Sequence, residues 1–535
     1  MAGALRSAGA TLAFGVPGGG PNLDTIGAFE DAGLRFVLAH SETAGALMAA
    51  TAAELTGAPS ACLATRGPGA ASMANGIAHA LLDRCPVLAI SDVVPARQRR
   101  RITHQLLDQR RLLGASAKAS CSLGTGARTV AGDAVRLTRQ VPWGPVHVDL
   151  DPTAASDGSE LQASPASGFF DADAHRAREV LGAASRPLIL AGIGARGEHQ
   201  AIRDFAERYG VPVLATYKAK GCVDEHSPLA AGVLTGATVE APMLAAADAI
   251  LAIGLDPVEL IPAPWPYLAP IVTVGPWVSV DEYFPVEVAL AGTVPETLAV
   301  LSDAISGEAW GDAPLQHRSR VRSRLLETLA PDGTIGPTDV VVATREAFGA
   351  QTIATVDAGA HMLPAMELWT VPGPQQALIS SGLATMGFAL PAAIAAALVH
   401  ADLPIVCFTG EGGLGMCLGE LETVARLRLN ITIVVLDDAR LSLIELKQRA
   451  AGQGGEGAVR YEPVDFAALA TAMGVRGQRV TEPEALREAV KTAAGSAGPS
   501  LLDVVIDPSS YGHILEVIRG GARMPDPALP PTLLR

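Results

Sequence analysis

The chain has 535 residues, which is too long for one hydrophobic core and predicts roughly three domains. Its formal net charge of −15 argues against a nucleic-acid partner, and its longest uninterrupted apolar run, near residues 389–399, is too short to span a bilayer. The start of the chain lacks the pattern of a secretory signal and the six cysteines form no CxxC pair, so we expect a reduced, cytoplasmic protein.

Strands alternate with helices along the chain, and glycine turns separate them, which is typical of parallel α/β domains. The pattern predicts three consecutive doubly wound parallel-sheet domains, at residues 1–152, 174–316 and 338–515. A linker rich in Ser, Ala and Gly (153–173) and a charged, helix-prone connector (317–337) join them, and a proline-containing tail (516–535) follows.

In the first domain, an apolar strand at 36–39 leads into His40-Ser41-Glu42, and a helix is expected at 43–56. Ser41 is a suitable N-cap, so Glu42 lies in the first helical turn, at the C-terminal end of a strand. From the residues alone, Glu42 fits either a catalytic acid or an acid that complements the helix dipole.

The central domain carries a glycine turn, residues 192–197, that fits the GxGxxG dinucleotide fingerprint. The next strand, at 212–215, leads to Thr216-Tyr217-Lys218 and supplies no acid to hold a ribose. We therefore interpret the turn as structural and expect no FAD. A nucleotide-dependent oxidoreductase is the disfavoured alternative for this turn.

In the third domain, a strand at 404–409 runs into a turn, Gly410-Glu411-Gly412-Gly413, and a helix is expected at 418–429. A second apolar strand, at 431–436, ends in Asp437-Asp438. Parallel strands bring Glu411 and Asp438 to one edge of a sheet, with glycine N–H groups between them, which suits a divalent cation bridging to a diphosphate. Two unrelated surface acids are the alternative.

The spacing and flanks of this segment resemble the thiamine diphosphate-binding motif, in which Gly-Asp-Gly precedes a helix, a strand and Asn. Residues 15–18, 40–42 and 65–69 are similar to the N-terminal domain of the same enzymes. The resemblance extends over nearly the whole chain and points to an acetolactate synthase-like enzyme. It implies a pyrimidine-binding first domain, a Rossmann-like middle domain and a diphosphate-binding third domain.

The resemblance also implies residue roles. Glu42 is expected to hydrogen-bond the pyrimidine of thiamine diphosphate and to work as a tautomer switch and proton relay. Met386, which its residue type alone would place in the core, is expected to prop the two cofactor rings into a V shape. The other expected cofactor contacts are Gly359, His361, Thr385, Gly410, Gly412 and Gly413. Mg²⁺ is expected on Glu411, Asp438 and the main-chain carbonyl of Arg440.

Three positions depart from the family pattern. Glu411 stands where aspartate is usual, and its extra methylene moves the carboxylate by roughly 1.5 Å, although Mg²⁺ tolerates little departure from octahedral geometry. Asp438 stands where asparagine is usual, and in this it resembles the FAD-independent, catabolic acetolactate synthases. Ala360 stands where acetolactate synthases usually have glutamine.

A 2-oxo acid substrate needs a cation or hydrogen-bond donors for its carboxylate. Lys447 stands where the biosynthetic enzymes carry an acceptor-lining tryptophan, so we expect it to bias the acceptor toward a polar or anionic group. A solvated helix lysine is the alternative. The candidate substrate residues are His104, Gln105, Lys447 and Gln448, together with Arg66 and Lys118.

The leading hypothesis is a thiamine diphosphate- and Mg²⁺-dependent enzyme that decarboxylates a pyruvate-like 2-oxo acid and transfers the acyl unit to an acceptor. A simple 2-oxo acid decarboxylase is one alternative. A non-catalytic paralogue acting as a binding or regulatory subunit is another, because the acid pair is altered. By analogy we expect a homodimer or homotetramer whose active sites lie between the first domain of one subunit and the third domain of another.

Overall fold

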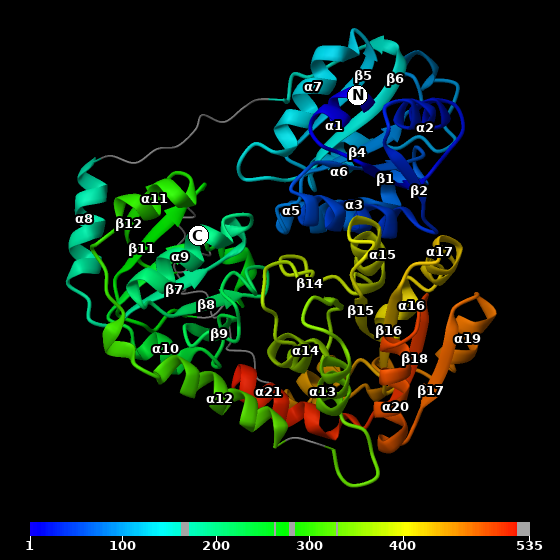
Figure 1. The fold of residues 1–535 in the computed structure, drawn as a ribbon. Helices are drawn as coiled ribbons and strands as arrows, with labels where there is room; N and C mark the ends of the chain where they lie inside the picture. Colours follow the sequence, from blue (N-terminus) through cyan, green and yellow to red (C-terminus); the bar gives the residue numbers. More distant parts are fainter. Residues whose placement is uncertain (162–170, 262–263, 278–283, 328–329, 522–535) are drawn as a thin grey trace.

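The computed structural model describes residues 1–161, 171–261, 264–277, 284–327 and 330–521. These residues form three six-stranded parallel sheets, one in each of three domains (Figure 1). The predicted fold class, three consecutive parallel-sheet α/β domains, is therefore confirmed. All six cysteines are buried and free, and none of the described helices is long and apolar enough to cross a membrane.

The N-terminal sheet has the strand order β2-β1-β3-β4-β6-β5. Its strands are β1 (Leu12–Val16), β2 (Arg35–Leu38), β3 (Ser60–Ala64), β4 (Val87–Asp92), β5 (Ala119–Thr125) and β6 (Val146–Ala155). Its helices are α1 (Ala2–Ser7), α2 (Pro21–Asp31), α3 (Glu42–Thr56), α4 (Pro68–Ser72), α5 (Ala74–Leu82), α6 (Gln109–Gly114) and α7 (Ala127–Thr138). The inner strands β3 and β4 are buried along their whole length, because helices cover both faces of the sheet.

The central sheet has the order β12-β11-β10-β7-β8-β9. Its strands are β7 (Pro187–Ala191), β8 (Val213–Thr216), β9 (Ala230–Leu234), β10 (Ala249–Ile253), β11 (Ile271–Gly275) and β12 (Val286–Ala291). The helices are α8 (Asp171–Gly182), α9 (His199–Tyr209), α10 (Ala241–Ala246), α11 (Val294–Val300) and α12 (Ala313–Leu326). Helix α12 runs from this domain toward α21 of the third domain (Figure 1).

The C-terminal sheet has the order β14-β13-β15-β16-β18-β17. Its strands are β13 (Ile353–Val356), β14 (Ala377–Ile379), β15 (Ile405–Gly410), β16 (Ile431–Asp437), β17 (Arg476–Val480) and β18 (Ser500–Val505). Its helices are α13 (Pro337–Ala347), α14 (Met362–Leu368), α15 (Ala389–Val399), α16 (Glu411–Met416), α17 (Glu420–Leu427), α18 (Ser442–Ala450), α19 (Phe466–Ala472), α20 (Pro483–Ala494) and α21 (Tyr511–Arg519).

Two local predictions about helices have different outcomes. The predicted cap of α3 is confirmed, since the Ser41 side chain accepts a hydrogen bond from the Ala44 N–H at 3.1 Å. After β15, the turn predicted at residues 410–413 is wrong, whereas the helix predicted at 418–429 is confirmed by α17 (Glu420–Leu427). Helix α16 begins directly at Glu411, with Gly410 in an extended conformation as its N-cap, and α17 follows as a separate helix.

The secondary structure extends past several predicted boundaries. Strand β6 enters the predicted linker because its pairing with β5 continues to Ala155, where composition alone suggests a loop. Helix α12 begins before residue 317, and α21 continues beyond residue 515. The remaining linker residues 162–170 and the tail after residue 521 lie outside the described residues.

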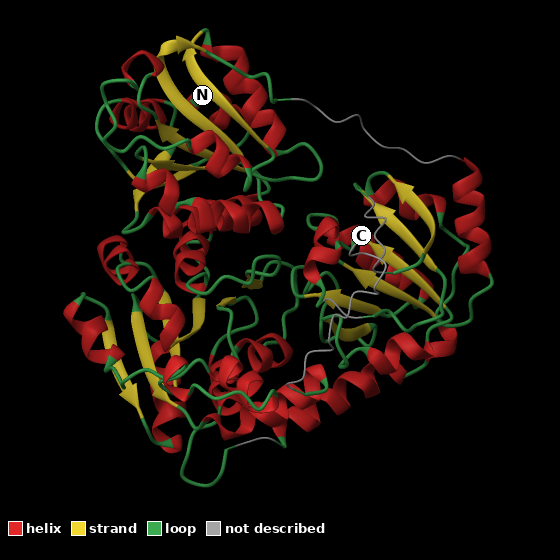
Figure 2. Ribbon diagram, turned by 180° about the vertical axis from the view of Figure 1, so that it is seen from behind, coloured by secondary structure: helices red, strands yellow, loops and turns green. Residues whose placement is uncertain are grey.

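The first and third domains share one hydrophobic core. Helices α3 and α15 pack against each other beneath the N-terminal sheet, as both views show (Figures 1 and 2). Both helices are rich in alanine and apolar on nearly all sides, so each needs cover on every face. Their small side chains allow the two helices to approach closely. The position of α3 therefore depends on the third domain as well as the first.

Candidate active site

A cavity of about 310 Å³ opens at the C-terminal ends of β13, β15 and β16. This edge of a parallel α/β sheet is where ligands usually bind. Of the residues predicted from the sequence, the cavity is lined by Gly359, His361, Met386, Gly410, Glu411, Gly412, Gly413, Asp438, Arg440 and Lys447. The other predicted residues, Glu42, Arg66, His104, Gln105, Lys118, Thr385 and Gln448, do not line it.

Glycines form one wall of the cavity because larger residues would not fit. A Cβ atom on Gly413 would lie 2.1 Å from Oδ2 of Asp357, and one on Gly359 would lie 2.6 Å from Cε1 of His361. A Cβ on Gly412 would lie 3.3 Å from Cε of Met386. The glycines therefore let the backbone pack directly against the side chains that shape the cavity.

Asp357 is the residue that sequence reasoning missed, although an acid directly after a buried strand is a signal that marks it. Its side chain is completely buried and accepts hydrogen bonds from the N–H groups of Gly387 and Phe388 and from the Thr409 hydroxyl, each at 3.0 Å. Burial nevertheless raises its pKa to about 6. Asp357 thus ties the segment that carries Met386 to the end of β15.

His361 has an unpaired ring nitrogen beside the cavity. Its Nε2 is buried and has no hydrogen-bond partner among the described residues. Burial lowers the pKa of the imidazole to about 4, so the ring is neutral at neutral pH. Buried polar atoms are usually hydrogen-bonded, and this nitrogen therefore fits a contact with a ligand in the cavity.

The two predicted metal-binding acids both line the cavity. Glu411 accepts a hydrogen bond from the Arg440 N–H at 2.9 Å, and Asp438 accepts one from the Ser442 hydroxyl. Burial, and to a lesser extent the charge of Asp438, raises the pKa of Glu411 to about 8. Burial also raises the pKa of Asp438, to about 6. A cation would offset both burial and repulsion, so the pair fits a bound divalent metal.

Main-chain and non-protein groups would have to complete such a metal site. Among the residues that the structure describes, no three side chains of His, Cys, Asp or Glu are grouped to hold a metal ion. The predicted set contains only two carboxylates and the Arg440 carbonyl. This composition suits Mg²⁺, which usually keeps several water or phosphate oxygens among its ligands.

The segment around Met386 lies between the cavity and the first domain. Met386 lines the cavity, whereas the hydroxyl of the adjacent Thr385 points to the first domain and donates to Asn75 at 3.0 Å. The role of Thr385 as a cofactor contact stays a prediction. Its N–H already donates to the Ser380 hydroxyl at 3.2 Å.

Lys447 and Gln448 lie on α18, and only Lys447 lines the cavity. Lys447 is partly buried and shares the cavity wall with Tyr511 and Ile444. A cation at this position can interact with an anionic ligand in the cavity.

Glu42 lies at the N-terminus of α3 and does not line the cavity of its own chain. The close approach of α3 to β1 holds it there, because a Cβ on Gly45 would lie 2.8 Å from the Cα of Gly15. A Cβ on Gly69 would lie 2.9 Å from Oε1 of Glu42, so the carboxylate faces the first turn of α4. His104 and Gln105 belong to the same domain, where His104 is exposed.

The glycine turn of the central domain is closed by a protein carboxyl. Ile193 donates its N–H to Oε2 of Glu259 at 2.7 Å, and the Thr216 hydroxyl donates to Oε1 at 2.5 Å. Glu259 is buried, and it takes the N–H that a dinucleotide phosphate would otherwise approach. This supports the structural interpretation of the turn. The expectation that no FAD binds stays a prediction.

Comparison with known proteins assigns the family. Models described as the N-terminal TPP binding, central and C-terminal TPP binding domains of the thiamine pyrophosphate enzymes match residues 1–112, 174–301 and 357–504. The acetolactate synthase isozyme 2 large subunit of Escherichia coli (strain K12) is 30% identical over 523 residues, which cover 94% of each chain. The chain belongs to the thiamine pyrophosphate enzyme family.

Two further relatives of this thiamine pyrophosphate enzyme are acetolactate synthases. That of Bacillus subtilis (strain 168) is 27% identical over 94% of this chain and 92% of the relative. The catabolic enzyme of Raoultella terrigena is 28% identical over 94% of this chain and 93% of the relative. The resemblance predicted from the sequence, to a thiamine diphosphate-dependent enzyme of acetolactate synthase type, is therefore confirmed.

The residues present fit the cofactor of this family, thiamine pyrophosphate (thiamine diphosphate). The glycine wall admits close backbone approach, the unpaired His361 nitrogen has a free hydrogen-bonding position, and the two acids fit a cation that would accompany a diphosphate. The cavity lies within the matched C-terminal TPP-binding domain, and Glu42 lies within the matched N-terminal one.

Proposed function

We propose that this enzyme uses thiamine diphosphate and Mg²⁺ to decarboxylate a pyruvate-like 2-oxo acid and to transfer the remaining acyl unit to an acceptor. The observation that carries the proposal is the cavity of the third domain. There the glycine wall, the unpaired nitrogen of His361 and the Glu411 and Asp438 carboxyls line one space. The similarity to acetolactate synthases supports a carboligase.

In this proposal Glu411, Asp438 and the Arg440 carbonyl hold Mg²⁺, while His361 and the backbone at Gly412 and Gly413 hold the diphosphate. When bound, thiamine diphosphate supplies a nucleophilic carbon and an electron sink for the decarboxylation. The protein contributes binding, orientation and exclusion of water, with Met386 supporting the cofactor rings from the cavity wall.

We infer that Glu42 acts in the cavity of another subunit. Its carboxylate faces Gly69 within its own first domain and does not line the cavity of its own chain. A glutamate that shuttles a proton to the cofactor must lie within hydrogen-bonding reach of it. A homodimer or homotetramer that brings the first domain of one subunit to the third domain of another meets this requirement.

Lys447 would favour an acceptor with a polar or anionic group, because its side chain lines the cavity where the acceptor would enter. Replacement by alanine should shift the preference toward apolar aldehydes across a panel of aldehydes and oxo acids. An unchanged preference would assign Lys447 to the solvated face of α18. In this proposal the partners of the enzyme are its small-molecule substrates. The six free, buried thiols suit a cytoplasmic location.

The test is incubation of the purified enzyme with pyruvate, thiamine diphosphate and Mg²⁺, with CO₂ release and carbon products followed together. A carboligase forms a product with a new carbon–carbon bond, whereas a simple decarboxylase releases acetaldehyde. The Glu411→Gln variant, which keeps the side-chain length and removes the charge, should lose activity. Absence of turnover with a panel of 2-oxo acids, although cofactor binds, would favour a non-catalytic paralogue.

A further inference from the structure

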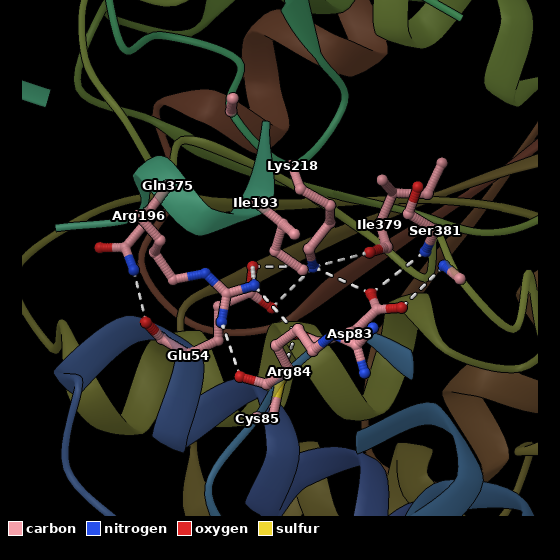
Figure 3. Close-up of polar contacts among 12 residues, drawn as sticks. Glu54, Asp83, Arg84, Cys85, Ile193, Arg196, Lys218, Gln375, Ile379 and Ser381 are labelled. Carbon is pink, nitrogen blue, oxygen red and sulfur yellow. Dashed lines mark hydrogen bonds and ion pairs between the residues drawn. The ribbon is translucent and has the colours of Figure 1, made fainter. Parts of the chain in front are cut away.

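Four charged side chains are buried together where the three domains meet (Figure 3). Glu54 lies near the end of α3 and Asp83 directly follows α5, whereas Arg196 and Lys218 come from the loops after β7 and β8 of the central domain. The side chains of Lys218, Asp83 and Glu54 are 1%, 0% and 3% exposed, and that of Arg196 is 9% exposed. The two acids and two cations balance each other in charge.

Lys218 is the centre of this cluster. Its Nζ lies 2.7 Å from Oε1 of Glu54 and 3.1 Å from Oδ2 of Asp83, and it donates to the main-chain oxygen of Ile379 at 3.1 Å. The hydrogen bonds of this ammonium group go to Glu54 and Ile379, and its contact with Asp83 is an ion pair. One side chain of the central domain thus holds the first domain and the end of β14 in the third domain.

Asp83 links the cluster to the start of segment 379–388, which carries Met386. Its carboxylate accepts from the Gly382 N–H at 2.8 Å and the Ser381 N–H at 3.1 Å. Although burial by itself would raise the pKa of Asp83, Lys218, His79 and these two N–H groups lower it, so the carboxylate is ionised. A charged acceptor makes both main-chain hydrogen bonds stronger.

His79, one helical turn before Asp83, contacts the same segment, residues 379–388. The ring of His79 lies 3.0 Å from the Ser380 hydroxyl, which accepts from the N–H of Thr385. At the other end, Asp357 accepts from the N–H groups of Gly387 and Phe388. The segment 379–388 is therefore fixed at both ends by buried carboxylates, and Ala384 and Met386 line the cavity between these ends.

A buried ion cluster is weak evidence for stability, because apolar residues of similar volume would often pack as well. What charged groups add is a defined geometry, and here that geometry leads to the wall of the cavity. The central domain would then contribute to the active site through Lys218 and not by binding a nucleotide, because the carboxyl of Glu259 occupies the glycine turn of this domain.

We propose that Lys218 is a positioning residue that fixes, through Asp83 and Ile379, the conformation of segment 379–388 on which thiamine diphosphate binding depends. The proposal rests on the proposed function for its binding consequence. Its structural consequence, a rigid main chain at Ser381 and Gly382, is independent of any ligand.

The test compares Lys218→Met with Lys220→Met. Lys220 is a matched control because its side chain is also 1% exposed, and its one ion pair among the described residues, at 2.5 Å, is with Glu225. Hydrogen–deuterium exchange of a peptide covering 377–388 is measured on the protein without cofactor, and thiamine diphosphate binding with Mg²⁺ is measured by titration calorimetry. Lys218→Met should raise both the exchange rate of this peptide and the dissociation constant by at least about tenfold.

Lys220→Met should leave both quantities near the wild-type values. Wild-type exchange and affinity in Lys218→Met, or equal changes in both variants, would overturn the proposal. If Lys218→Met does not fold, Asp83→Asn replaces it, with the same expected rise in exchange at residues 381 and 382 and the same refutation if none occurs. Failure of the wild type to bind the cofactor would refute the proposed function instead, and the exchange comparison would still decide the role of Lys218.

Discussion

Replacing Gly413 by alanine should dismantle the cofactor cavity. The added Cβ would lie 2.1 Å from Oδ2 of Asp357 and 3.1 Å from Oγ1 of Thr409, closer than atoms in contact normally approach. Asp357 is fully enclosed, so its carboxylate has to move and lose the bonds that Oδ2 accepts from Gly387 and Thr409. Each hydrogen bond to a charged group contributes about 1.5–3 kcal/mol, so the loss is about 3 kcal/mol or more.

The control is Gly415→Ala in the same helix. A Cβ on Gly415 meets nothing within 4 Å, and alanine is favoured over glycine in a helix by up to about 1 kcal/mol. Urea unfolding of the cofactor-free protein and calorimetric titration with thiamine diphosphate and Mg²⁺ measure both variants. We expect Gly413→Ala to lower the free energy of unfolding by about 3 kcal/mol, and to bind thiamine diphosphate more weakly than the wild type because the displaced Asp357 releases the segment that carries Met386. Equal affinity in the two variants would refute the assignment of the glycine wall to the cofactor.

Three further predictions concern other parts of the chain. Glu42→Gln should bind thiamine diphosphate normally but turn over at least about a hundredfold more slowly, since it removes a proton relay and leaves the cavity intact; normal turnover would assign Glu42 to the helix dipole. Mixing Glu42→Gln with Glu411→Gln under conditions of subunit exchange should restore part of the activity if each site uses two subunits, and no recovery despite demonstrated exchange would place the whole site within one chain. Glu367→Gln should flatten the pH dependence of stability: burial raises the pKa of Glu367 from 4.5 to about 8, so its stabilising contribution is complete below pH 4.5 and is lost as pH rises to about 8. Thermal melting between pH 5 and pH 8.5 checks this, and parallel curves for the two proteins would contradict it.

Local sequence patterns predicted much of the fold. The apolar runs that became β3, β10 and β15 were evident because strands buried on both faces carry few polar residues. The start of α3 was predictable because an N-cap serine is a local signal. Helix α16 was missed since its glycine-rich sequence has low helix propensity, and the close packing of Gly413 on Asp357 explains the glycines only after folding.

The candidate site was predicted where its residues adjoin a motif and missed where it depends on distant contacts. His361 and Met386 were identified from the resemblance, and the structure adds the unpaired Nε2 of His361 beside the cavity. Lys218 and Glu54 are 164 residues apart in sequence, so no local pattern links them. Their contact follows from how three domains pack, which periodicity and composition do not encode.

The most direct test of the central claim is calorimetric titration of the purified protein with thiamine diphosphate, first with Mg²⁺ and then after its removal by a chelator. We predict binding near one site per chain that depends on the metal, because a cation stabilises the ionised forms of Glu411 and Asp438 and links these carboxylates to the diphosphate. Absence of binding with Mg²⁺ and with every other divalent metal tried would contradict the assignment of this cavity to the cofactor.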